Sequence, residues 1–209
     1  MARYVSQAVI RRLPGYYRHL KELEREGISQ ISSQELGKRM DLTPSQIRQD
    51  INCFGGFGRQ GFGYAVAVLR EHIGMILGID REQTLLVVGA GNIGRAVALS
   101  DSFPLSGFRV AAIFDNDPQK IGKEIGSIKV QDTAHIALYI SENHTDICVI
   151  AVPGNKAQAV AEELYQTGLR AFWNFAPTDL KLPGDSMLVN VHLEEGLQIL
   201  SYRMLHRDG

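Results

Sequence analysis

A strand–turn–helix segment at residues 85–99 limits the fold of this chain more than any other stretch. The apolar run 85–88 leads into GAGNIG at 89–94, and helix-forming residues follow at 95–99. A Gly-x-Gly-x-x-Gly pattern alone is weak evidence, but in this context a pyrophosphate can rest on the helix N-terminus. We expect the turn to leave no room for a Cβ at Gly91, because the backbone there approaches the ligand closely. The segment predicts a dinucleotide-binding unit.

A carboxylate follows the next apolar run. Residues 108–114 end in Asp115, about 20 residues beyond the glycine turn, where an acidic side chain accepts hydrogen bonds from the adenosine ribose. The following residues, 116–118, contain no arginine that could pair with a ribose 2′-phosphate. We therefore expect NAD(H) rather than NADP(H).

Further apolar runs at 146–152, 171–175 and 188–191 complete a doubly wound parallel sheet of the Rossmann type, and a last helix is expected at 193–206. In such sheets the carboxyl ends of the strands border the ligand crevice. The turns at 152–153 and 174–175 are therefore expected beside the nicotinamide half, although the first is equally typical of a plain strand-to-helix turn. The predicted nucleotide-binding residues are Gly89, Ala90, Gly91, Asn92, Ile93, Gly94, Asp115, Val152, Pro153, Asn174 and Phe175.

The N-terminal third carries the positive charge of the chain. Residues 1–64 contain ten Lys and Arg against six Asp and Glu (10 − 6 = +4), and the remainder contains 12 against 17 (12 − 17 = −5). This excess favours contact with a polyanion, although a solvated helical surface would show the same excess. Helical spacing predicts a helix over 5–13 that stops before Pro14, and a second helix that ends at Gly27.

A helix-turn-helix is predicted over residues 32–52. Thr43 is a favourable N-cap and Pro44 a favourable first helical residue. The helix that follows buries Ile47 and Ile51. It exposes a polar face on its other side, in which arginine and glutamine can pair with guanine and adenine in the major groove; this face consists of Ser45, Gln46, Arg48 and Gln49.

The stretch FGGFGRQGFGY at 54–64 has the composition of a winged-helix wing. Its glycines permit a tight hairpin, and its aromatic residues would anchor that hairpin to the small core. A purely structural hairpin is the alternative, but Arg59 at the tip favours insertion into the minor groove. The predicted DNA-contacting residues are Arg12, Thr43, Ser45, Gln46, Arg48, Gln49, Arg59 and Gly61.

The composition and the spacing of apolar residues both change after residue 80. This change divides the chain into a winged-helix domain, 1–80, and a Rossmann domain, 81–209. No apolar run is long enough to span a bilayer, and the N-terminus lacks a signal peptide, so we expect a cytoplasmic protein. Cys53 and Cys148 suggest neither a disulfide framework nor a metal site.

A catalytic set is missing from the sequence, because its histidines show no spacing with a partner base. We therefore expect the nucleotide to be a regulatory ligand and the protein not to be an enzyme. The alternatives are a small NAD-dependent oxidoreductase with an N-terminal dimerisation module, and a constitutive DNA-binding protein whose Rossmann domain only dimerises.

The chain resembles the Rex family of redox-sensing transcriptional repressors in the order of its motifs. This order is the winged helix, the FGxFGxxGxGY wing, the GxGNxG turn, the strand-terminal Asp, NFAP at 174–177 and the apolar C-terminal helix. The resemblance covers essentially the whole chain. It implies a homodimer with exchanged C-terminal helices that binds palindromic double-stranded operator DNA and releases it when NADH accumulates relative to NAD⁺. It also implies that Arg48 and Arg59 contact DNA, and that GAGNIG and Asp115 hold the adenosine end.

Two departures from the family pattern stand out. Many relatives read Arg-Lys-Asp where this chain reads Arg48-Gln49-Asp50, so an amide replaces a cation on the recognition helix. An Arg–Tyr–Asp set that links subunit closure to DNA release in some relatives maps to Arg18, Ser100 and His192, of which only the arginine is kept.

Overall fold

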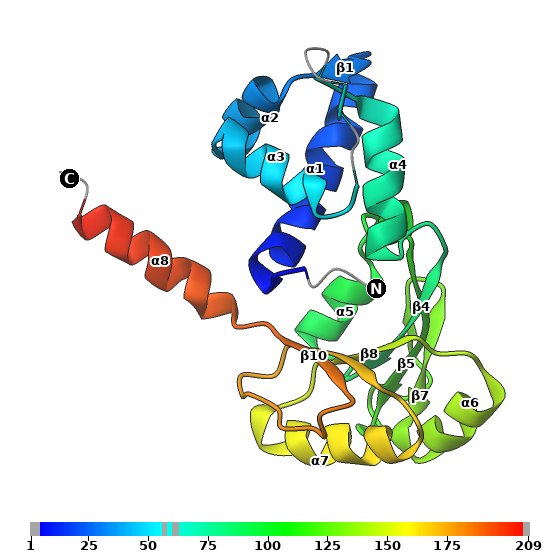
Figure 1. Cartoon of the computed structure of the whole chain (residues 1–209). Helices are drawn as coiled ribbons and strands as arrows, with labels where there is room; N and C mark the ends of the chain where they lie inside the picture. Colours follow the sequence, from blue (N-terminus) through cyan, green and yellow to red (C-terminus); the bar gives the residue numbers. More distant parts are fainter. Residues whose placement is uncertain (1–4, 56–57, 60–62, 207–209) are drawn as a thin grey trace. The chain divides into compact units, whose positions relative to one another are not determined.

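The computed structural model describes residues 5–55, 58–59 and 63–206. The chain divides into two compact units, Met1–Arg81 and Glu82–Gly209, each with its own core (Figure 1). Within the described residues, no helix combines the length and apolarity that crossing a bilayer requires.

The N-terminal unit combines helices with a small antiparallel sheet. Its elements are α1 (Gln7–Arg25), β1 (Gln30–Ile31), α2 (Ser33–Met40), α3 (Pro44–Asn52), β2 (Gly58–Arg59), β3 (Gly63–Ala65) and α4 (Val66–Leu77). The three-stranded sheet has the order β1-β3-β2. Ser32 and Glu35 form a capping box at the start of α2, and the Thr43 hydroxyl accepts a hydrogen bond from the Gln46 amide at the start of α3.

The prediction of two helices separated at Pro14 is wrong, because Pro14 lies inside the single helix α1. Proline removes one backbone hydrogen bond from a helix interior and disfavours its continuation. Here Leu13, Tyr16 and Leu20 lie in the core on one face of α1, and this burial on both sides of the proline favours one continuous helix.

The described part of the wing sequence forms two antiparallel strands. Gly58 pairs with Tyr64 and Arg59 pairs with Gly63 across β2 and β3. Gly63 has φ of +76°, and a Cβ there would lie 2.5 Å from the Ile31 carbonyl oxygen, so this position requires glycine. Tyr64 is buried in the core of the unit, as expected for an aromatic anchor.

The C-terminal unit contains a seven-stranded sheet in the order β10-β9-β8-β4-β5-β7-β6. The strands are β4 (Gln83–Val88), β5 (Phe108–Asp115), β6 (Glu124–Ile125), β7 (Ile128–Asp132), β8 (Ile147–Ile150), β9 (Ala171–Asn174) and β10 (Met187–Asn190). All pairings are parallel except that of β6 with β7. The chain continues from β4 to β5 on one side and later returns to place β8 on the other side of β4, which creates a topological switch point at β4.

Helices lie on both faces of this sheet, as Figure 1 shows for α5 and α7. The helices of the unit are α5 (Asn92–Ala98), α6 (Ile136–Glu142), α7 (Gly154–Gln166) and α8 (Leu193–Leu205), with short 3₁₀ turns at Pro104–Ser106 and Thr133–His135. Alternate residues of β4 enter different cores, since Leu86 packs with α6 and α7 while Val87 packs with α5. The predicted doubly wound α/β fold is confirmed.

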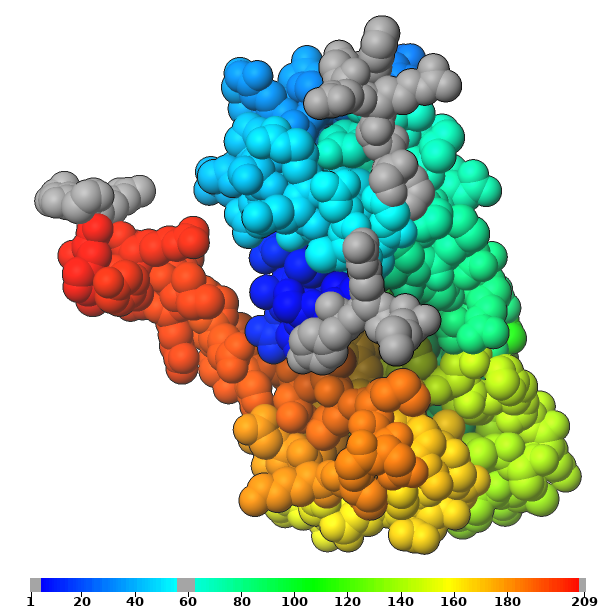
Figure 2. Space-filling view, in the orientation of Figure 1, coloured from blue at the N-terminus to red at the C-terminus, as the bar shows by residue number. Residues whose placement is uncertain are grey.

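Helix α8, red in Figures 1 and 2, has no buried residue. Its exposed apolar side chains are Leu193, Leu197, Ile199, Leu200, Tyr202, Met204 and Leu205. The neighbouring strand β10 adds Met187 and Val189, which are also exposed. This apolar surface of α8 and β10 is therefore largely exposed to solvent in a single copy of the chain.

Candidate nucleotide site and DNA-reading surface

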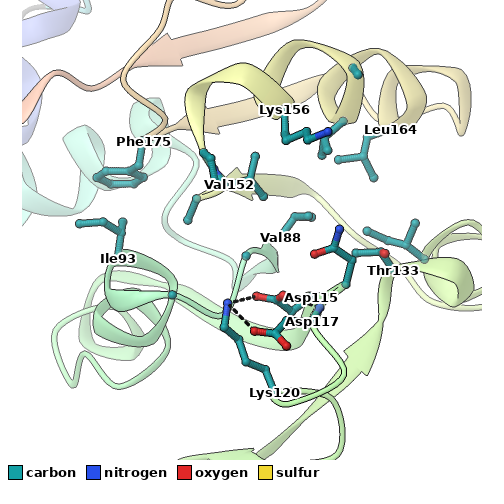
Figure 3. Close-up of a pocket in the computed structure, with 18 of the residues that line it drawn as sticks. Val88, Ile93, Asp115, Asp117, Lys120, Thr133, Val152, Lys156, Leu164 and Phe175 are labelled. Atoms are coloured by element: carbon teal, nitrogen blue, oxygen red, sulfur yellow. Dashed lines mark hydrogen bonds and ion pairs between the residues drawn. The ribbon is translucent and has the colours of Figure 1, made fainter.

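An open cavity of about 930 Å³ lies at the carboxyl ends of β4, β5 and β8, at the topological switch point. Ligands of open α/β sheets bind at this place. The predicted residues that line the cavity are Gly89, Gly91, Asn92, Ile93, Asp115, Val152, Pro153 and Phe175. Figure 3 shows Ile93 and Phe175 toward one side, Thr133 and Leu164 toward the other, and Asp115 below.

The glycines of GAGNIG have different roles. Gly89 has φ of +104° and a Cβ there would meet the Ala151 carbonyl, while a Cβ on Gly94 would meet the Gly89 carbonyl, so the fold itself requires both. Gly91 has ordinary backbone angles, with φ of −78°, and a Cβ there would have no atom within 4 Å. The expectation that the turn has no room at Gly91 is therefore wrong: the space beside Gly91 belongs to the cavity.

Asp115 lies at the carboxyl end of β5 and is only 6% exposed. Its Oδ2 accepts the Ala90 amide proton at 2.7 Å, and its Oδ1 accepts the Asp117 amide proton at 2.9 Å. Burial alone raises the pKa of this carboxyl, but these hydrogen bonds and a 3.1 Å ion pair with Lys120 outweigh it and lower the pKa. The carboxylate is thus held charged and oriented beside the cavity.

Lys120 was missed by sequence reasoning, which considered only residues 116–118 after the strand. Its Nζ lies 3.1 Å from Asp115 Oδ2 and 3.7 Å from Asp117 Oδ2 (Figure 3). The turn that brings it back begins at Asp117, whose carbonyl accepts the Lys120 amide proton at 2.9 Å. Lys156, in the first turn of α7, also lines the cavity and was not predicted.

Three predicted residues do not line the cavity. Ala90 contributes its amide to Asp115, and Gly94 allows α5 to begin close to β4. Asn174 is fully buried: its amide donates to the Thr178 carbonyl and to Asn190 Oδ1, and its oxygen accepts the Ala176 amide proton. Asn174 was expected to border the crevice, but the structure places it away from the cavity, because both polar atoms of its side chain form hydrogen bonds near the end of β9.

The polar face of α3 lies as predicted, with Ile47 and Ile51 buried and Arg48 and Gln49 exposed. Arg48 donates a hydrogen bond of 3.1 Å to the Ser33 hydroxyl on α2. A shallow hollow of about 500 Å³ is lined by the N-cap residue Thr43 and by three predicted residues of α3, which are Ser45, Gln46 and Gln49. Neighbouring hydroxyl, amide and guanidinium groups of this kind can contact phosphates and base edges.

Arg12 also borders this hollow, but its charge is already paired. Its Nε and Nη2 donate to Asp50 Oδ2 and Oδ1 at 2.7 and 2.8 Å. A buried carboxylate of α3 therefore engages two of its three guanidinium nitrogens, and the contact of Arg12 with DNA stays a prediction. Arg59 lies in β2, and Gly61 lies outside the described residues.

The three residues that align with the Arg–Tyr–Asp set of some relatives are Arg18, Ser100 and His192, and the hydrogen bonds of the last two are local. Arg18 is exposed on α1, and the Ser100 hydroxyl lies 2.8 Å from that of Ser102. His192 Nε2 lies 2.9 Å from Asp179 Oδ1, and this hydrogen bond raises the pKa of the histidine. Across residues 5–55, 58–59 and 63–206, no cluster of His, Cys, Asp and Glu suits a metal ion.

Comparisons with known proteins agree with this division. A family model described as the N-terminus of putative DNA-binding proteins matches residues 4–52, and one described as a CoA binding domain matches residues 80–178. The redox-sensing transcriptional repressor Rex of Caldanaerobacter subterraneus subsp. tengcongensis is 47% identical over 200 residues, which are 96% of this chain and 89% of that protein. The Rex protein of Clostridium perfringens strain SM101 is 46% identical over 204 residues, 98% of this chain and 96% of that one.

Solved structures show the same similarity. The structure of RSP in complex with β-NAD⁺ and operator DNA matches with a TM-score of 0.92 and 45% identity, covering 98% of this chain and 94% of that one. The structure of RSP with β-NADH matches with a TM-score of 0.90 and 43% identity, covering 98% and 96%.

A winged-helix unit joined to a dinucleotide-type Rossmann unit defines a class of ligand-responsive DNA-binding regulators. Within that class, the chain belongs to the Rex family of redox-sensing transcriptional repressors. Its relatives are regulators and not enzymes, so the oxidoreductase alternative is not supported.

Proposed function

We propose that this protein binds palindromic operator DNA as a homodimer and releases it when NADH replaces NAD⁺. The observation that carries the proposal is the pairing, in one chain, of an exposed polar face on α3 with an open switch-point cavity that contains an oriented carboxylate. The relative RSP, whose structure contains both β-NAD⁺ and operator DNA, supports the same pairing of ligands.

The two tasks are assigned to different parts of the chain. Residues 1–80 bind DNA through α3 and the wing, and residues 81–209 bind the nucleotide. The glycine turn holds the pyrophosphate at the start of α5, Asp115 accepts hydrogen bonds from the adenosine ribose, and Phe175 borders the nicotinamide half. A DNA-binding repressor of this kind acts in the cytoplasm.

Helix α8 provides the dimer contact in this proposal. Its exposed side chains form a continuous apolar element that a single copy leaves in water, and burying such a surface is the main driving force for association. In the homodimer, the C-terminal helices (193–206) are exchanged between subunits. A twofold dimer matches a palindromic operator, because each subunit then reads one half-site.

The nucleotide acts by shifting a population. NADH releases the operator only if it binds the DNA-incompetent arrangement of the dimer more tightly than the DNA-competent one. A change from mostly bound to mostly free needs about 3–5 kcal/mol of differential affinity summed over two sites.

The test is a fluorescence anisotropy titration of the protein on a labelled palindrome, without nucleotide, with NAD⁺ and with NADH. NADH should lower the operator affinity and NAD⁺ should not. An operator affinity that neither nucleotide changes would favour a constitutive DNA-binding protein.

The carboxylate of Asp115 should set the choice of cofactor. Asp115→Asn keeps the shape of the side chain but replaces a carboxylate oxygen, which can accept hydrogen bonds from ribose hydroxyls, and removes the negative charge that repels a 2′-phosphate. We expect NADH affinity to fall by about 1–3 kcal/mol and the advantage of NADH over NADPH to narrow. Calorimetry on both nucleotides measures this, with Asp101→Asn, an exposed carboxylate outside the cavity, as the control. An unaltered NADH/NADPH ratio would remove Asp115 from the site.

The wing arginine should contribute a nucleic-acid contact. Arg59→Ala is expected to weaken operator binding and to reduce the slope of log affinity against log salt by about 1. Arg81→Ala removes the same charge from an exposed position outside the wing and serves as the control. If affinity and salt slope both match the parent protein, the hairpin has only a structural role.

A further inference from the structure

Helix α3 has a charged group on its buried face. Asp50 is 3% exposed and lies on the same side as Ile47 and Ile51, which pack into the core of the N-terminal unit. An ionised carboxylate is costly to bury unless it is paired and hydrogen-bonded. Its partners therefore explain how the fold tolerates it.

Both partners of Asp50 come from α1, one helical turn apart. Arg12 donates from Nε and Nη2 to the two carboxylate oxygens at 2.7 and 2.8 Å, and the hydroxyl of Tyr16 donates to Oδ2 at 2.9 Å. Tyr16 is fully buried, and both its burial and its hydrogen bond to Asp50 raise its pKa. The phenol therefore remains a hydrogen-bond donor to Asp50.

These bonds constrain α3 in a way that apolar packing does not. The burial of Ile47 and Ile51 is non-directional and tolerates small rotations of the helix about its axis. A two-pronged arginine–carboxylate pair with a third donor has defined angles, and it restricts both rotation and sliding of α3 along α1.

The constrained helix carries the groups proposed to read DNA. Arg12 and Asp50 border the same hollow as polar residues of α3, so this ion pair lies beside the polar face of the helix; these residues are Ser45, Gln46 and Gln49. Bidentate readout of a base edge depends on the placement of the reading side chain. A shift of the helix would therefore weaken specific contacts while leaving general attraction to phosphates intact.

We propose that Arg12, Asp50 and Tyr16 form a positioning network that sets the orientation of α3 for sequence-specific DNA recognition. Arg12 acts through Asp50 in this role and not as a phosphate contact. The inference rests on the proposed function of α3 as the recognition helix.

Electrostatics and positioning predict opposite signs for one variant. Asp50→Asn removes a negative charge from the DNA-binding unit, which by charge alone strengthens binding to any DNA. If the network positions α3, the same change weakens operator binding, because the arginine fork loses its partner. Tyr16→Phe removes only a hydroxyl and changes no charge.

The experiment measures the affinities of the full-length protein for operator and for random-sequence DNA at fixed salt. We expect the operator-to-random affinity ratio to fall about tenfold for Asp50→Asn and about threefold for Tyr16→Phe, with NADH affinity unchanged. The control is Glu26→Gln, which breaks a pair of the same kind, Arg39 with Glu26 at 2.7 Å, on an exposed surface outside α3. This control should keep the ratio of the parent protein.

Circular dichroism and thermal unfolding of each variant come first, and Tyr16→Phe carries the test if Asp50→Asn does not fold. A ratio at the parent value in a folded variant, or equal strengthening on both DNAs, would overturn the positioning role. Arg48→Ala separates the two levels of inference. If it alters base preference while Tyr16→Phe does not, only the network proposal fails; if it alters nothing, the recognition helix itself is misassigned.

Discussion

Replacing Gly91 with valine is expected to leave the protein on its operator at NADH concentrations that release the parent protein. The backbone at Gly91 suits any residue, with φ of −78°, and a Cβ there meets no atom within 4 Å. The variant should therefore fold. Its side chain would occupy part of the cavity where the pyrophosphate would approach the glycine turn, so NADH affinity should fall about 10- to 100-fold.

The measurement is an anisotropy titration of both proteins on the same palindrome over a range of NADH concentrations. Gly184→Val is the matched control, because Gly184 has equally open space around it but does not line the cavity. Circular dichroism confirms that both variants are folded. If NADH still releases the Gly91→Val protein, the nucleotide acts elsewhere than at GAGNIG.

Replacing Arg48 with alanine is expected to weaken operator binding by about 1–3 kcal/mol and to relax base preference at one position in each half-site. The free energy of unfolding should change little, because Arg48 is exposed and its hydrogen bond to Ser33 is a surface contact. The lost interaction is the pairing of a guanidinium with a base edge in the major groove.

Selection of binding sites from a randomised half-site library measures the change in preference, and a titration on the best operator measures the affinity. Arg25→Ala removes the same charge from an exposed position at the end of α1 and should keep the parent preference. Identical selected sequences for parent and Arg48→Ala would contradict the assignment of α3 as the recognition helix.

Local features of the fold were predictable because short spacings determine them. The run of apolar residues before GAGNIG predicts a buried strand, and the glycines that follow permit the turn into α5; the structure confirms both. Thr43 and Pro44 predict the first turn of α3 for a similar reason, since capping depends on the next few residues only. The segment 124–142, with β6, β7 and α6, lacked such signals and was not predicted.

Side-chain partners were not predictable, because they join distant parts of the chain. The sequence suggested that Arg12 contacts DNA, but a carboxylate 38 residues away engages it. Lys120 reaches Asp115 through the turn after β5, and the amide of Asn174 satisfies neighbouring backbone groups instead of facing the crevice. Each of these side chains could form hydrogen bonds with several different groups, and the packing of the fold determines which group lies within reach.

The sequence by itself therefore determined the position of the glycine turn, the carboxylate at the end of β5 and the polar face of α3. Each follows from hydrophobic period, capping and backbone permissiveness, which act over a few residues. The tertiary structure decided which polar groups remain free for a ligand and which are occupied by the protein. That distinction depends on burial and on contacts between α1 and α3, or between β5 and the turn that follows it, and no local pattern contains it.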